Sequence, residues 1–97
     1  MRTRYSPRAI DDLIAIADYL TEQNPTAARA VESKIRSTVD FLAEFSAGGR
    51  LLDQRKQVRV MPIARYPYLV FYTVKADEVI ILHVRHGARA PVDLNDL

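Results

Sequence analysis

Two long apolar stretches near the C-terminus break the alternation that is typical of a strand with one face in water. Residues 65–74 read RYPYLVFYTV, and residues 79–89 read VIILHVRHGAR. Antiparallel strands with one wet face alternate apolar and polar residues, so near-continuous apolar runs indicate two covered faces. We therefore predict strands at 68–74 and 79–86, joined as a hairpin by the short connection KADE. Both faces of the first strand are largely apolar, whereas one face of the second turns polar at His83 and Arg85.

The N-terminal half has the periodicity of two helices instead. Ser6 can cap a helix and Pro7 suits its first position, which predicts a helix over 7–22. Asn24 followed by a proline repeats this signal and predicts a second helix from 25 to about 45. The link between them is so short that the helices should form an antiparallel hairpin. The apolar stripe expected to face the core of the first helix comprises Ile10, Leu13, Ile14, Ala17 and Leu20.

Adding a short strand at 2–5 and another at 58–63 gives the order β-α-α-β-β-β. This order predicts an α+β fold in which the helical hairpin packs on a C-terminal three-stranded antiparallel sheet. The chain has 97 residues, which is the length of one domain, so we expect a single domain over 1–97.

One helical hairpin can cover only one face of that sheet. The other face is then expected to expose apolar side chains, and contiguous patches of this kind usually mark a protein interface. We expect Leu69, Phe71, Val79 and Ile81 to form this partner-binding face. The alternative is that residues 89–97 or a bent first strand cover it.

Charge adds a second feature to the same half of the chain. Residues 50–89 carry eight basic and three acidic side chains, whereas residues 1–44 carry six basic and seven acidic ones. A basic surface attracts an acidic partner, either protein or nucleic acid, although it can also be a merely solvated face. Guanidinium groups bind carboxylates and phosphates bidentately. The positions expected to gather at one end of the sheet are Arg59, Arg65, Arg85, His86 and Arg89.

Enzymatic chemistry finds little support in the residues. The chain has no cysteine, and His83 and His86 should lie on opposite faces of their strand, so we expect no metal and no cofactor. His86 could act as a general acid or base, but it is more often a packed histidine at a strand end. We expect no catalytic residue. The lack of cysteines, of a signal peptide and of a membrane span favours a cytoplasmic location.

The ordered set GGR at 48–50, Arg59, YPYLVFYTV at 66–74 and VIILHVRHGAR at 79–89 resembles the ParE toxins of ParD–ParE toxin–antitoxin modules. The N-terminal SPRAIDDLIAIADYL and NPTAARAVESKI look like the family's opening hairpin. This resemblance implies a RelE/ParE-like fold and a bacterial toxin that inhibits DNA gyrase by protein–protein binding. It also implies a ParD antitoxin that covers the toxin in a 2:2 or larger complex and alone contacts DNA.

Two alternatives to gyrase inhibition stay open. The RelE branch of the superfamily cleaves ribosome-bound mRNA, and Arg59, Arg85 and His86 could match its basic residues. The clustered lysines and the final tyrosine of that branch are missing here, which favours the gyrase-directed interpretation. The third possibility is an inactive protein that only binds antitoxin, and toxicity on expression would distinguish it from the other two.

Overall fold

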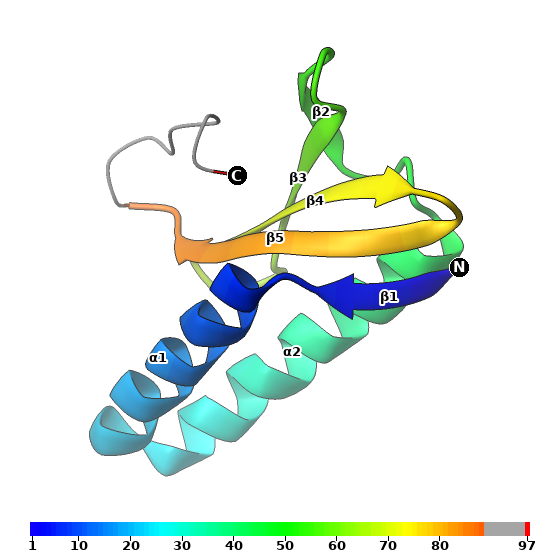
Figure 1. The fold of residues 1–97 in the computed structure, drawn as a ribbon. Coiled ribbons are helices and arrows are strands. Elements are labelled where there is room, and N and C mark those ends of the chain that lie inside the picture. The colour runs from blue at the N-terminus through cyan, green and yellow to red at the C-terminus, as the bar shows by residue number, and fades with distance from the viewer. Residues whose placement is uncertain (89–96) are drawn as a thin grey trace.

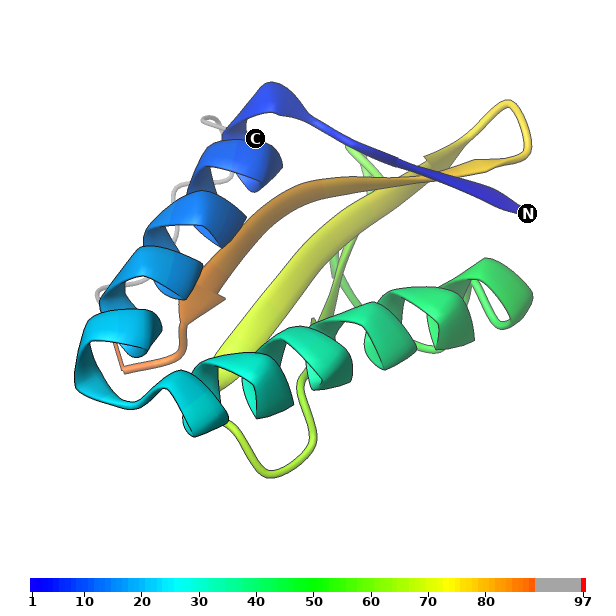
Figure 2. The same ribbon diagram turned by 90° about the horizontal axis from the view of Figure 1, so that it is seen from below.

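A computed structural model describes residues 1–88 and 97 of the chain as five strands and two helices. The strands form one sheet in the order β1-β5-β4-β3-β2, and both helices lie against the same face of it (Figures 1 and 2). The elements are β1 (Arg2–Tyr5), α1 (Pro7–Gln23), α2 (Pro25–Glu44), β2 (Arg50–Asp53), β3 (Val58–Pro62), β4 (Tyr68–Lys75) and β5 (Glu78–His86). The expected α+β class and element order are confirmed.

The sheet is larger than the three strands expected from the sequence. β1 pairs in parallel with β5, and the unpredicted strand β2 pairs antiparallel with β3. β2 has only four residues and follows the pair Gly48–Gly49, so its sequence resembles a flexible link. Figure 1 shows the β2–β3 ribbon rising from the sheet on the side opposite the helices.

Side-chain caps begin both helices where the sequence indicates. The Ser6 hydroxyl accepts a hydrogen bond from the Ala9 amide at 3.1 Å. The Asn24 side chain accepts from the amides of Thr26 and Ala27 at 3.0 and 3.2 Å. Asn24 alone joins the two helices, which forces them into the antiparallel hairpin. Neither of these helices is long and apolar enough to cross a membrane.

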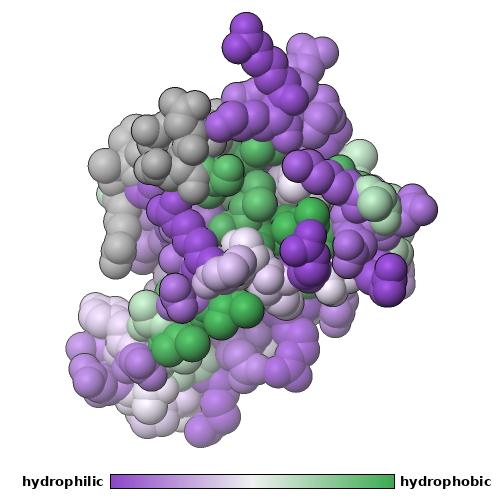
Figure 3. Space-filling view, viewed as in Figure 1, coloured by the Kyte–Doolittle hydropathy of each residue, from purple (hydrophilic) through white to green (hydrophobic). Residues whose placement is uncertain are grey.

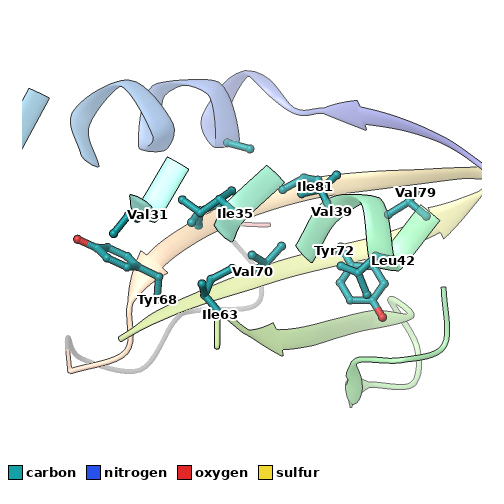
Figure 4. Close-up of a cluster of buried hydrophobic side chains, with 12 residues drawn as sticks. Val31, Ile35, Val39, Leu42, Ile63, Tyr68, Val70, Tyr72, Val79 and Ile81 are labelled. Carbon is teal, nitrogen blue, oxygen red and sulfur yellow. The ribbon is translucent and has the colours of Figure 1, made fainter. Parts of the chain in front are cut away.

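The core lies between α2 and the middle of the sheet (Figure 4). One stripe of α2 is buried as its 3.6-residue periodicity predicts, and it packs against the inward-facing residues of β4 and β5. The buried residues of α2 are Val31, Ile35, Val39 and Leu42. The strand residues opposite them include Val70, Tyr72, Val79 and Ile81.

α1 packs on a face that only partly matches the expected one, since Leu13 and Leu20 contact the core as predicted. Ala9 is fully buried, and the residues that pack beside it on the core are Leu13, Ile16 and Leu20. Ile10 and Ile14, which the sequence pattern assigned to the core, are 48% and 55% exposed. That part of the prediction is wrong. Because α2 already covers the centre of the sheet, α1 lies along its margin.

Tyr72 ties the loop after α2 to the sheet. Its buried hydroxyl accepts from the Gly49 amide at 2.8 Å and donates to the Ser46 carbonyl at 2.7 Å. A Cβ atom at Gly49 would lie 2.6 Å from the Tyr72 ring, so only glycine allows this approach. Burial raises the pKa of the Tyr72 phenol above its ordinary value, against the smaller opposing effects of Gly49 and Arg59.

We expect Tyr72→Phe to lower the free energy of unfolding by about 1–3 kcal/mol, because the Gly49 amide and the Ser46 carbonyl lose their partner. Urea denaturation followed by circular dichroism measures the change. Tyr19→Phe is the control, since Tyr19 is 60% exposed, and it should change stability by less than about 0.5 kcal/mol. Equal effects of the two substitutions would contradict the assigned role of Tyr72.

Candidate partner-binding surface

An apolar groove of about 310 Å³ runs between α1 and α2 and reaches the end of β1. Its walls are mainly aliphatic, and Glu32 and Arg36 form an ion pair at its rim. Figure 3 shows the corresponding band of hydrophobic surface between the two helices. The residues lining the groove include Leu13, Ile16, Leu20, Val31 and Ile35, with Tyr5 at the end.

Tyr5 closes this groove with a half-buried side chain. Burial raises the pKa of its phenol above 10.0, the negative charge of Asp40 raises it further, and Arg36 opposes both effects. Tyr5 therefore presents a neutral hydroxyl at the end of an otherwise apolar groove. Ile10 and Ile14 of α1 are also exposed. Besides the residues that it packs on the core, α1 therefore offers apolar surface to a partner.

The sheet residues expected to form an exposed partner-binding face are mostly buried. Phe71 is 3% exposed, Val79 and Ile81 are not exposed, and only Leu69 is half-buried. The expectation that all four are exposed is wrong. Val79 and Ile81 point toward the helices and belong to the main core.

The sequence pattern grouped Val79 and Ile81 with Leu69 and Phe71, whereas in the hairpin they pair with Val74 and Tyr72 on the helical side. A β-bulge follows them in β5. Phe71 pairs with His83 and Tyr72 pairs with Ile81, which leaves Leu82 as an extra residue in the ladder. Strict alternation would place Ile81 and His83 on one face, but an inserted residue reverses the assignment beyond it. The β5 residues facing the helices are therefore Val79, Ile81 and Val84.

The opposite face of the sheet carries its own buried side chains. Val60 pairs with Phe71, and Phe71 pairs with His83, whose ring stacks on it at a centroid distance of 5.7 Å. Thr73 and Ile80 continue this row and are 4% and 8% exposed. The apolar character of both faces of β4 is thus confirmed, although this second face is not an open patch.

Arg59 does not join the expected arginine cluster. Its guanidinium donates to the carbonyl of Gly49 at 2.8 Å and, at 3.4 Å, to that of Ala47. It pairs in register with Tyr72, on the side of the sheet that faces the helices. Arg59 therefore supports the same loop that Tyr72 holds.

The other described members of the cluster lie at one end of the sheet. Arg65 is exposed in the turn before β4, Arg85 is opposite Leu69, and His86 is opposite Tyr68. The His86 ring meets the Tyr68 ring edge-on at 5.5 Å, and its Nδ1 accepts from the backbone amide two residues later at 3.1 Å. Arg89 lies outside the described residues.

Asp12 and His83 form a pair that the sequence did not single out. The Asp12 carboxylate lies 2.5 Å from His83 Nδ1 and accepts from the Val84 amide at 3.0 Å. The pair borders a pocket of about 460 Å³ beside β5, which Tyr19, Tyr68, Arg85 and His86 also line. The described residues contain no group of three side chains suited to hold a metal ion.

The pair connects α1 to the part of β5 that lies beyond its pairing with β1. No local pattern could have identified it, since 71 residues separate the partners in sequence. The adjacent Asp11 is exposed, so the two aspartates that look alike in the sequence have different environments.

We expect Asp12→Ala to reduce the free energy of unfolding by about 1–3 kcal/mol, because two partly buried donors lose their acceptor. Asp11→Ala is the matched control and should have an effect within about 0.5 kcal/mol. Thermal and urea unfolding of both variants would measure the difference. If Asp12→Ala behaved like its neighbour, the connection between α1 and β5 would not depend on this carboxylate.

Comparisons with known proteins give this fold a family. The family model for the ParE toxin of the type II toxin–antitoxin system parDE matches residues 3–91. Toxin RelE2 of Caulobacter vibrioides is 36% identical over 83 residues, covering 84% of this chain and 90% of the relative. The putative toxin Y4kP of Sinorhizobium fredii is 38% identical over 86 residues, covering 89% and 88%.

A solved structure agrees with these sequence relatives. The chromosomal ParDE toxin–antitoxin system from P. aeruginosa contains a chain that matches with a TM-score of 0.76 and 25% identity. The match covers 89% of this chain and 95% of that one. On the family model, the sequence relatives and the shared fold, this chain belongs to the ParE toxin family of type II toxin–antitoxin systems.

Proposed function

We propose that this toxin inhibits DNA gyrase by protein–protein binding and that a ParD antitoxin neutralises it. The observation that carries the proposal is the apolar surface of the helical hairpin, where a groove adjoins the exposed Ile10 and Ile14. A soluble chain that leaves such surface open gains stability when a partner covers it.

The antitoxin is expected to seat an amphipathic helix in the groove between α1 and α2. Helix-in-groove recognition uses apolar anchors at helical spacing, and the aliphatic walls of this groove suit them. The open apolar surface thus lies on the helical hairpin, whereas the sequence pattern placed an exposed apolar face on the sheet.

Binding rather than bond cleavage also fits the positions of the arginines. Arg59 uses its guanidinium to hold backbone carbonyls, and it lies on the opposite side of the sheet from Arg85. Cleavage of a phosphodiester needs a base, an acid and charge stabilisation around one reacting group. Arg65, Arg85 and His86 instead give one end of the sheet a basic surface for an acidic region of the target.

The second candidate function is ribosome-dependent cleavage of mRNA. It is favoured by that same gathering of Arg65, Arg85 and His86 at one end of the sheet. Under this alternative the three side chains would contact RNA, with His86 as the proton donor or acceptor.

Parallel assays of gyrase supercoiling and of a translating ribosome system test the proposal. We expect the purified chain to abolish supercoiling or accumulate cleaved gyrase–DNA complexes, and Arg85→Ala to weaken this effect. Truncating an interfacial arginine that becomes buried on binding costs ~2–5 kcal/mol of binding free energy. Lys34→Ala, on α2, is the control and should retain inhibition. Codon-specific mRNA cuts with unchanged supercoiling would contradict the proposal and support the alternative.

Ile14→Glu tests the antitoxin-binding surface. Ile14 is 55% exposed, so the fold should tolerate the change, while antitoxin affinity should fall at least about tenfold because a carboxylate would be desolvated against apolar groups. Ser33→Glu is the matched control: Ser33 is exposed on α2 and does not line the groove. Isothermal titration with the antitoxin measures both variants, and equal affinities would place the antitoxin elsewhere.

A further inference from the structure

The two layers of the molecule carry opposite net charges. Residues 7–44, which form the helical hairpin, hold four basic and seven acidic side chains, a net charge of −3. The described strands and loops, residues 1–6 and 45–88, hold nine basic and three acidic side chains, a net charge of +6. Both helices lie on one face of the sheet (Figure 2), so an acidic layer backs a basic one. Such a field orients a charged partner before contact.

The strand register places three cations on the outer face of the sheet, which is the face opposite the helices. Arg50 pairs with Val60 in β3, and Arg4 pairs with Ile80 in β5. Val60 and Ile80 belong to the buried row on the outer face, and directly paired residues have their side chains on the same side of a sheet. Lys75 is two residues beyond the last member of that row in β4, so it lies on the outer face too.

The tip of the β2–β3 ribbon extends this basic surface. Arg4, Arg50 and Lys75 are exposed, and so are Arg55 and Lys56 in the turn between β2 and β3. Figure 3 shows hydrophilic side chains over that tip. A pocket of about 330 Å³ connects the tip to the sheet, because both turn residues line it together with Lys75. The tip and the outer face therefore share one basic surface.

Acidic side chains offset this charge only in part. The Glu78 carboxylate, on the same face, lies 3.8 Å from Arg4 Nε. Asp53 accepts a hydrogen bond from the Lys56 amide at 3.0 Å, so its carboxylate holds the turn. Asp77, in the turn between β4 and β5, is the third acidic residue in the described strands and loops. Three carboxylates cannot neutralise nine cations, so the basic layer suits a polyanion.

Duplex DNA has the complementary charge and a matching size. It carries one negative charge per ~1.7 Å of its axis, and at a strand spacing of ~4.8 Å the outermost of the five strands lie about 19 Å apart. Several phosphates can therefore contact the outer face at once. We propose that the outer face binds the phosphate backbone of duplex DNA through Arg4, Arg50 and Lys75. The choice of DNA as the polyanion rests on the proposed function, since gyrase acts on DNA.

This contact belongs to the toxin itself, whereas the resemblance to ParE toxins implies DNA contact by the antitoxin alone. Phosphate contacts position a protein on the duplex but carry no sequence information, so the binding is independent of sequence. The acidic helical layer points away from the DNA. The groove between α1 and α2 therefore stays accessible while the outer face is occupied.

Fluorescence anisotropy with a labelled duplex of mixed sequence tests the site between about 50 and 200 mM salt. The double variant Arg50→Ala/Lys75→Ala should weaken binding at least about tenfold at the lowest salt. It should also reduce the slope of log affinity against log salt by about 1.8, because each phosphate contact contributes ~0.9. Both side chains are exposed, so the fold should tolerate the changes, and circular dichroism checks this.

Arg29→Ala/Lys34→Ala is the matched control, because it removes the same net charge from α2 and should leave DNA binding within about twofold of the unchanged chain. Equal weakening by both double variants would overturn the inference, since net charge alone would then explain the binding. Failure to bind the duplex at the lowest salt would also overturn it, and gyrase inhibition that persisted in that case would leave the proposed function intact. Duplex binding that depends on Arg50 and Lys75 without inhibition of supercoiling would support the inference and contradict the proposed function. Preferential binding of single-stranded RNA or of polyglutamate over the duplex would overturn the assignment of DNA.

Discussion

The arrangement of the whole molecule depends on how the outer edge of β5 is satisfied. β1 pairs with β5 only as far as Ile81, and buried backbone groups beyond that point need other partners. The Ser6 hydroxyl donates to the Leu82 carbonyl at 3.0 Å, and the Asp12 carboxylate accepts from the Val84 amide. The chain thus passes from β1 into α1 at the point where the outer edge of β5 stops pairing with a strand. Beyond that point, side chains form the hydrogen bonds to this edge.

The bulge at Leu82 helps to arrange the same edge of β5. By inserting one residue, it turns Val84 toward the core while His83 reaches the Asp12 carboxylate beside the edge. A regular strand would have placed these two side chains the other way round. Holding α1 against this edge also keeps it away from the middle of the sheet, which α2 covers. The groove and the exposed isoleucines of α1 follow from that displacement, so the surface proposed for the antitoxin originates in the pairing of β5.

The sequence predicted those features of the fold that local physical chemistry determines. The caps at Ser6 and Asn24, the buried stripe of α2 and the two-faced apolar character of β4 all appear in the structure. It did not reveal β2, whose four residues are too few to show a period, nor the bulge, which strict alternation conceals. Ile10 and Ile14 of α1 were misassigned because that helix has apolar residues on two sides, and only the neighbouring elements decide which side is buried.

The candidate site was predictable only in part, for a related reason. Arg65, Arg85 and His86 lie at the same end of the sheet, whereas Arg59 lies two strands away from Arg85 with its guanidinium on backbone carbonyls. Residue type gives the charge of a position, but the strand register decides on which face of the sheet its side chain lies.

The apolar groove lies on the helical side and Arg85 on the other face of the sheet. A partner that must affect both regions therefore has to pass around an edge of the sheet. The register of the strands thus places the apolar groove and Arg85 on different faces of the sheet, and only the edges connect the two.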